Sequence, residues 1–408
     1  MTDSLVSRRT VAGALGVCGV ALAVGLATGF VRGMAKPMTS DAHYFLQAAQ
    51  SLAEGRGYRI HDTFWPDSLT MTRSPGWPVL VSLALRLFPA ASADVVMRCL
   101  CLLVNALIAG GVFLLAFRLF GRLPVAWVAG LGYAVHPVAL YLASDGDSEP
   151  LFVLLTVIGI WLCLPERACP EPVFRRPSAI PGFLLLGLAC IVRPNLILWI
   201  GALAVVLAAD LAKRRAASRD SLPPARPRLV GLCGALLCAA LFVAPSLLWA
   251  ARNYRICGHF PVLNTLGGEV FYGAHNEVTG SNFKYWGYWV FADEILGEKR
   301  MRDLAKNMSE YEMDRYYYRQ GTAYVRSHLS SMPWMELGKL VRAYVPVPWN
   351  LTAETAIVSG FRWILYAAAL IGFFRYWESA DGTFRASFMA MLLTNVATVL
   401  IFWGCARF

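Results

Sequence analysis

Two side chains in the segment 32–94 have the chemistry of a proton acceptor and of a phosphate ligand. Asp41 follows the helix-capping residue Ser40 and stands in the first turn of an amphipathic stretch, where a carboxylate complements the helix dipole. Arg73 opens the sequence Arg-Ser-Pro-Gly-Trp-Pro, whose prolines restrict the backbone. A guanidinium held in this way is suited to bind phosphate through two parallel hydrogen bonds. A capped interfacial helix and an ordinary headgroup anchor are the alternative interpretations.

Three carboxylates fall within five residues of the sequence Ser-Asp-Gly-Asp-Ser-Glu, namely Asp145, Asp147 and Glu149. Carboxylates so close together repel one another unless a cation or a proton offsets their charge. Three interpretations remain open: a solvated acidic turn, a site for a hard divalent cation, and an acid that orients an incoming hydroxyl group. The sequence indicates no certain cofactor, and metal dependence stays open.

Two further arginines follow apolar stretches, in Arg193-Pro194 and in Arg252-Asn253. An ionisable residue at the end of a membrane span is either a snorkelling anchor or a binding group. If Arg73, Arg193 and Arg252 converge beside Asp41, the result is one acid and several cations, which is the charge layout for handling a phosphate.

The composition places these residues in a membrane protein. The 408-residue chain is 57% hydrophobic and 15% charged, and its mean hydropathy is +0.51, whereas soluble domains carry about a quarter charged residues. The net charge of +11 does not indicate nucleic-acid binding, because most Lys and Arg residues lie in short loops between apolar stretches. The ten cysteines contain no Cys-x-x-Cys pair and predict neither a disulfide framework nor a zinc site.

The apolar stretches predict an all-α polytopic membrane protein, since about 20 apolar residues cross a bilayer as a helix. The segment 77–91 is shorter and is expected at the membrane interface, which suits Trp77. Arg8-Arg9 before the first stretch also resembles a twin-arginine export signal, but a first span is the better interpretation. About nine spans are predicted: 11–31, 95–117, 123–143, 150–165, 179–192, 195–212, 229–251, 357–374 and 386–404.

The distribution of Lys and Arg predicts the orientation. Basic residues gather in alternate loops, above all in the linker 213–228, and this positive-inside pattern assigns those loops to the cytoplasm. Two long loops, 32–94 and 252–356, then face the outside together with the acidic turn and Arg193, and we expect both to contain interfacial helices. The expected location is the bacterial inner membrane, with the polar chemistry on the periplasmic or exterior face.

The order of these motifs resembles the GT-C superfamily of integral-membrane glycosyltransferases. The likeness is to bacterial relatives of dolichyl-phosphate-mannose protein mannosyltransferases and of lipid A aminoarabinose transferases. It covers nearly the whole chain and implies a single GT-C-like transmembrane domain over 1–408. The matched residues are Asp41, Tyr44, Ala48, Leu52, Gly55-Arg-Gly-Tyr58, Arg73-Ser-Pro-Gly-Trp-Pro78, Ser148-Glu149-Pro150, Arg193-Pro194, Arg252-Asn253 and the sequence LNTLGGEVFYGAHN.

The resemblance implies a reaction and a role for each residue. Such enzymes transfer a sugar from a polyprenyl-phosphate carrier to an acceptor molecule, typically with inversion. By this resemblance Asp41 is the general base and Arg73 holds the carrier phosphate, with Arg193 and Arg252 as further candidates for that phosphate. The turn containing Asp145, Asp147 and Glu149 corresponds to a second acidic position near the sugar, the acceptor molecule or a metal. Membrane lipids surround the protein, and the acceptor is a protein, a lipid or a glycan.

The chain also departs from the family pattern. Many members have two adjacent acids in the first loop, whereas Ala42 follows Asp41 here. The family commonly continues beyond an Arg-aromatic pair like Arg407-Phe408, so a short or truncated member is implied. Two other classes are alternatives: a flippase or transporter of lipid-linked sugars, disfavoured because the sequence contains no internal repeat, and an envelope-assembly scaffold, in which Asp41 would be freely replaceable.

Overall fold

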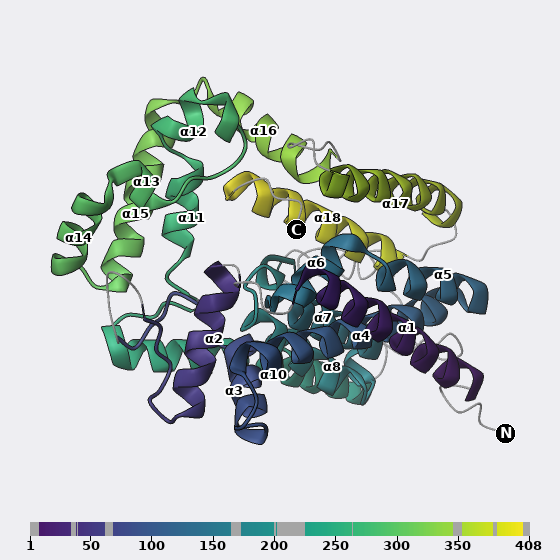
Figure 1. Ribbon diagram of the computed structural model, residues 1–408. Coiled ribbons are helices and arrows are strands. Elements are labelled where there is room, and N and C mark those ends of the chain that lie inside the picture. The colour runs from purple at the N-terminus through teal and green to yellow at the C-terminus, as the bar shows by residue number, and fades with distance from the viewer. Residues whose placement is uncertain are drawn as a thin grey trace. The chain divides into compact units, whose positions relative to one another are not determined.

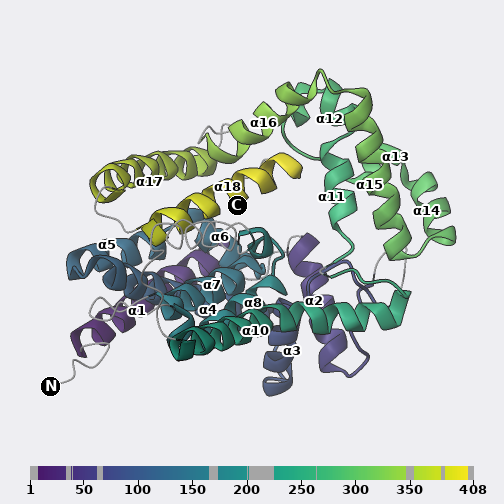
Figure 2. The ribbon, with the colours of Figure 1, turned by 180° about the vertical axis from the view of Figure 1, so that it is seen from behind.

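The structure is a computed structural model, and its described part is helical. The only β-structure there is an isolated bridge between Arg59 and Leu69, so the predicted all-α class is confirmed (Figures 1 and 2). The described residues are 8–33, 38, 40–61, 68–164, 173–199, 201, 225–262, 264–345, 353–377 and 382–402.

Four of the described helices are long and apolar enough to cross a membrane. They are α1 (Arg8–Arg32), α4 (Ala93–Phe120), α10 (Ala225–Cys257) and α17 (Ala353–Trp377). A fifth candidate is the pair α5 (Leu123–Ala134) and α6 (Pro137–Asp145), which bends by 49° where Pro137 begins the second helix. The chain therefore has the helices of a polytopic membrane protein, while the number nine stays a prediction.

Other predicted spans correspond to helices shorter than a bilayer requires. These include α7 (Glu149–Cys163), α8 (Ala179–Cys190) and the apolar part of α18 (Gly382–Ile401). The segment expected at the interface forms α3 (Gly76–Leu87), which has only 12 residues. Most of the predicted span 195–212 and of the basic linker 213–228 lies outside the described residues.

The chain divides into two compact units. The first contains Met1–Pro194 and Pro223–Leu263, and the second contains Asn195–Leu222 and Asn264–Phe408. The predicted first outer loop, 32–94, belongs to the first unit, and most of the second, 252–356, belongs to the second unit. The domain predicted over 1–408 therefore comprises two units, described in turn.

Helices α1, α4 and α5 pack against one another in the first unit, with Phe113 fully buried among them. The ring of Phe113 meets that of Trp127 edge to face, with 5.4 Å between ring centroids. Helix α7 packs between α4 and α8, and α8 packs on α10. Gly187 permits this last contact, because a Cβ atom there would overlap the backbone carbonyl of Phe242.

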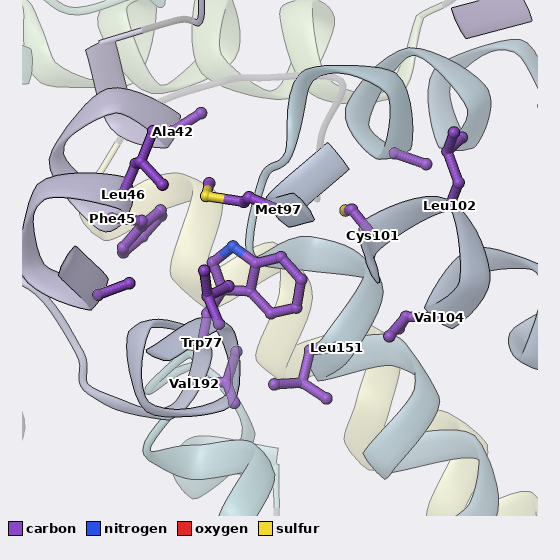
Figure 3. Close-up of a cluster of buried hydrophobic side chains, with 13 residues drawn as sticks. Ala42, Phe45, Leu46, Trp77, Met97, Cys101, Leu102, Val104, Leu151 and Val192 are labelled. Carbon is purple, nitrogen blue, oxygen red and sulfur yellow. The ribbon is translucent and has the colours of Figure 1, made fainter. Parts of the chain in front are cut away.

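Trp77 lies at the centre of a second cluster in the first unit, where α2 (Ser40–Ala53), α3, α4 and α7 meet. Figure 3 shows its indole surrounded by Phe45, Met97, Leu151 and Val192. The indole is fully buried, and its Nε1–H donates a hydrogen bond to the carbonyl oxygen of Gly146, 2.9 Å away. The ring therefore finds both apolar surroundings and a polar partner inside the protein, while the position of Trp77 at the depth of the membrane interface stays a prediction.

The second unit begins with α11 (Gly267–Ala274), which packs on α15 (Glu310–Ser327). The Gly268 N–H donates to the Asp314 carboxylate, 2.6 Å away, and a Cβ atom at Gly268 would overlap the Asp314 carbonyl. The other elements of this unit are α12 (Glu277–Ser281), η2 (Phe283–Tyr285), α13 (Ala292–Leu296), α14 (Glu298–Asn307), α16 (Met332–Tyr344), α17 and α18, and the first unit also contains η1 (Val173–Arg175).

A buried lysine joins three helices of the second unit. The Lys339 ammonium on α16 lies 2.7 Å from the carbonyl oxygen of Leu400 on α18, and 2.8 Å from each of His275 Nε2 and Glu336 Oε1. His275 Nδ1 faces the Phe271 carbonyl at 2.8 Å. A carbonyl only accepts, so Nδ1 carries the hydrogen and Nε2 accepts from Lys339. Burial lowers the pKa of Lys339, and Glu336 opposes that shift.

We expect Trp77→Phe to lower the free energy of unfolding by about 1–3 kcal/mol, because the Gly146 carbonyl loses its donor in a buried place. The measurement is thermal unfolding of the purified protein in detergent. Trp363→Phe is the matched control, since this tryptophan is more than half exposed. Equal melting temperatures for the two variants would show that the hydrogen bond contributes nothing.

Asp314 gives a pH-dependent prediction. Burial raises the pKa of its carboxyl group, and the Gly268 N–H and Arg315 oppose the shift. The contribution of such a group to stability is full below the unfolded-state pKa of 3.8 and declines as the pH rises through the higher folded-state value. Asp314→Asn keeps an oxygen for Gly268 but does not titrate.

We therefore expect the stability of Asp314→Asn relative to wild type to increase as the pH rises from about 4 to about 7. Melting temperatures at several pH values measure the difference. Asp303→Asn, an exposed acid on α14, is the control. A difference between Asp314→Asn and wild type that does not vary with pH would contradict the assignment of a raised pKa.

Candidate functional site

Asp41 and Arg73, which the sequence expects to converge on one face of the membrane, form an ion pair. Asp41 lies in the first turn of α2, and Arg73 precedes α3. Arg73 Nη2 is 3.1 Å from Asp41 Oδ1, and the Arg73 guanidinium also lies over the Tyr44 ring, 5.2 Å from its centroid. The Asp41 side chain is 41% exposed and that of Arg73 is 14% exposed, so the acid faces outward and the cation is enclosed.

The enclosed Arg73 has hydrogen-bond donors left over. Its Nε and Nη1 atoms are buried and have no hydrogen-bond partner within the described part of the chain. Buried donors without a partner are costly. Nε shares an edge of the guanidinium with Nη2, so an anion that accepts two parallel hydrogen bonds from this edge would displace Asp41 from Nη2. Arg73 therefore has donors for a phosphate or carboxylate that takes the place of Asp41.

The backbone that presents Arg73 is held on both sides. The Tyr58 hydroxyl lies 3.2 Å from the carbonyl oxygens of Arg73 and of Ser74 and shares its hydrogen between them. On the other side, the Gly76 N–H donates to the Ile191 carbonyl at 2.9 Å. A Cβ atom at Gly76 would overlap Val192, so glycine allows the turn before Arg193 to approach.

Arg193 is paired with Glu149. Arg193 Nη2 lies 2.7 Å from Glu149 Oε1, and its Nε donates to Ser148 Oγ at 3.4 Å. Glu149 is the first residue of α7, where a carboxylate complements the helix dipole. Both side chains are largely enclosed, Glu149 at 9% and Arg193 at 21% exposure. The charge of Arg193 is thus balanced within the protein.

The acidic turn is buried, so its interpretation as a solvated turn is wrong. Asp145, Asp147 and Glu149 are each less than 9% exposed. Helix α4 donates to its backbone twice: Arg98 Nη1 to the Ser144 carbonyl at 3.0 Å, and Cys101 Sγ to the Asp147 carbonyl at 3.3 Å. Among the described residues, no group of three His, Cys, Asp or Glu side chains is arranged to hold a metal ion.

Arg252 reaches the same loop from α10 but contacts its backbone. Nη1 donates to the Thr70 carbonyl at 2.6 Å and to Asn253 Oδ1 at 3.0 Å, and Nη2 donates to the Tyr58 carbonyl at 3.4 Å. The guanidinium also lies over the Trp249 ring, 4.6 Å from its centroid. Arg252 therefore holds the backbone of the segment that carries Arg73.

Four residues build this neighbourhood although the sequence analysis gave them no role at the site: Tyr44, Tyr58, Trp77 and Arg98. Tyr44 stands three residues after Asp41, and this helical spacing signals a shared face. Arg98 is an ionisable residue inside an apolar span, which is itself a signal of function or of a buried partner. Tyr58 and Trp77 act on backbone carbonyls, for which the sequence carries no signal.

Comparisons of the chain with protein-family models, with curated proteins and with solved structures find no match.

Glu149→Gln is expected to lower the free energy of unfolding by about 3 kcal/mol, because Arg193 loses the partner of an enclosed ion pair. Glu54→Gln is the matched control, since Glu54 and its partner Arg56 are more than half exposed, and an exposed pair contributes less than about 1 kcal/mol. Thermal unfolding of both variants tests this. A control as destabilised as Glu149→Gln would contradict the argument from burial.

Proposed function

We propose that this protein is an integral-membrane glycosyltransferase that moves a sugar from a polyprenyl-phosphate carrier to the hydroxyl group of an acceptor molecule. The observation that carries the proposal is the Asp41–Arg73 pair, with an outward acid beside an enclosed guanidinium that has unused donors. The resemblance of the motif order to GT-C glycosyltransferases supports it. The proposed location is the bacterial inner membrane, with the site on the periplasmic or exterior face.

Arg73 is the proposed ligand of the carrier phosphate. Two phosphate oxygens can accept from Nε and from one terminal nitrogen along the same edge of the guanidinium. Negative charge grows on the phosphate as the bond between the anomeric carbon and the phosphate oxygen breaks. A cation placed there stabilises the transition state more than the bound donor, which is the kind of interaction that accelerates a reaction.

Asp41 is the proposed general base. A phosphate that binds Arg73 competes with the Asp41 carboxylate for the guanidinium and leaves the carboxylate to contact the incoming hydroxyl group. The acceptor oxygen then bonds to the anomeric carbon from the face opposite the departing phosphate, and its proton passes to Asp41. The products are the inverted glycoside, free polyprenyl phosphate and protonated Asp41.

The Arg193–Glu149 pair borders this proposed site. The backbone hydrogen bond from Gly76 to Ile191 connects the Arg73 segment with the turn that contains Arg193. Because Glu149 balances Arg193, this pair suits hydroxyl groups of a sugar better than a second phosphate charge. The roles of Asp145 and Asp147 near the sugar, the acceptor molecule or a metal remain predictions.

The test uses purified protein in lipid nanodiscs, a panel of polyprenyl-phosphate sugars and a membrane extract as the source of acceptor molecules. We expect wild type to release free polyprenyl phosphate from one of the donors. Asp41→Asn should reduce this release by about 100-fold or more, because the proton acceptor is lost, while binding of the same donor is retained.

Glu54→Gln, which removes an exposed acid from the same segment, should release carrier at the wild-type rate. Two results would reject the proposal: wild type that consumes no donor in the panel, or Asp41→Asn that matches wild type. Movement of the intact donor across the membrane without release of the carrier would instead identify a transporter. If the protein neither releases the carrier nor moves the donor, a scaffold would be favoured.

A further inference from the structure

We infer that Arg252 is a positioning residue that acts on the carrier phosphate through Tyr58 and Arg73 and does not contact the phosphate itself. This inference rests on the proposed function. It departs from the sequence expectation, in which Arg252 was a direct ligand of that phosphate. Three sets of contacts in the first unit carry it.

The terminal nitrogens of Arg252 are already engaged by the protein. Both terminal nitrogens donate to oxygens, namely the carbonyls of Thr70 and Tyr58 and the side chain of Asn253. Asn253 is itself fully buried, and its Nδ2 donates to the Pro261 carbonyl at 3.2 Å. The guanidinium therefore sits in a fixed frame at the end of α10, and binding a phosphate would require it to abandon these oxygens.

Tyr58 links Arg252 to the backbone of Arg73. Its carbonyl oxygen accepts from Arg252 and from the Thr70 N–H, which lies 3.1 Å away. Its ring is buried and meets the ring of Trp249 edge to face, with 5.2 Å between centroids. Its hydroxyl reaches the carbonyl oxygens of Arg73 and Ser74. Arg252 thus holds the backbone of Tyr58, and the side chain of Tyr58 in turn holds the backbone of Arg73.

The segment 68–76 is therefore attached at three points. Thr70 bonds to Tyr58 and Arg252, the Arg73–Ser74 carbonyls contact the Tyr58 hydroxyl, and Gly76 bonds to Ile191. Removing Arg252 or the Tyr58 hydroxyl detaches the segment on the α10 side only. The Arg73 guanidinium would then lose its fixed position, although it keeps its charge and its pairing with Asp41.

A direct ligand and a positioning residue differ in their coupling to Arg73. If Arg252 acts through Arg73, its loss does nothing further once Arg73 is gone, so the two substitutions are not additive. If both arginines contact the phosphate independently, the effects of the two substitutions add. Tyr58→Phe also separates the two cases, because binding of the phosphate depends on the Tyr58 hydroxyl only if Arg252 acts as a positioning residue.

The experiment measures binding of a polyprenyl phosphate without a sugar to the full-length protein in nanodiscs, together with amide hydrogen exchange of the segment 68–76. Arg252→Ala and Tyr58→Phe should each weaken binding roughly tenfold, because each removes hydrogen bonds to the backbone that carries Arg73. Both should accelerate exchange in this segment. Arg73→Ala combined with Arg252→Ala should bind no more weakly than Arg73→Ala alone.

Two further variants sharpen the result. Arg252→Lys keeps the charge, but one ammonium cannot reproduce the planar fork that spans the Thr70 and Tyr58 carbonyls, so it should behave like Arg252→Ala. Arg255→Ala is the matched control, since it removes an exposed arginine from the next turn of the same helix. We expect it to alter neither binding nor exchange.

Three outcomes overturn the inference. The first is a further loss of binding when Arg252→Ala is added to Arg73→Ala, and the second is unchanged exchange in both Arg252→Ala and Tyr58→Phe. The third is wild type that binds no polyprenyl phosphate, which removes the proposed function as well. In that case the exchange data still show whether Arg252 and Tyr58 hold the segment, so the two failures are distinguishable.

Discussion

The hydrogen bond between the Trp77 indole and the Gly146 carbonyl is the contact on which the neighbourhood of Arg73 depends. It joins two parts of the chain that are 69 residues apart and lies inside an apolar cluster, where a carbonyl without a partner would be costly. Gly146 adopts a positive φ of 92°, which glycine tolerates without strain, and its backbone is thereby turned toward Trp77. Because Trp77 lies four residues after Arg73, fixing the indole also fixes the start of α3.

Charge balance is the second organising constraint. Two enclosed arginines of the first unit each have a carboxylate partner, Asp41 for Arg73 and Glu149 for Arg193. An unpaired charge in such a place would be costly. The two pairs differ in access, since Asp41 is 41% exposed and Glu149 only 9%. A ligand can therefore displace Asp41 from Arg73 far more easily than Glu149 from Arg193. This difference in access distinguishes a pair that can react from a pair that stabilises the fold.

The sequence predicted features that follow from periodicity and composition. The apolar helices α1, α4, α10 and α17 were found within a few residues of their predicted bounds, because their lengths match a bilayer. The helix that begins with Ser40 and Asp41 was found as well. The burial of Trp77 was not predicted, because an amphipathic indole suits an interface as well as a core, and its partner is a backbone carbonyl. For the same reason nothing in the sequence indicated that Arg252 contacts the carbonyls of Thr70 and Tyr58.

Lys339 has a geometric consequence for the second unit. Its three N–H bonds point along tetrahedral directions, and each meets an acceptor: one at the end of α11, one on α16 itself and one in the last turn of α18. Glu336 lies on the same helix as Lys339, so two of the three bonds link α16 to its neighbours, one to α11 and one to α18. A planar guanidinium cannot offer the same three directions from one atom. A single tetrahedral nitrogen can thus hold α11 and α18 to α16 while a carboxylate of α16 balances its charge.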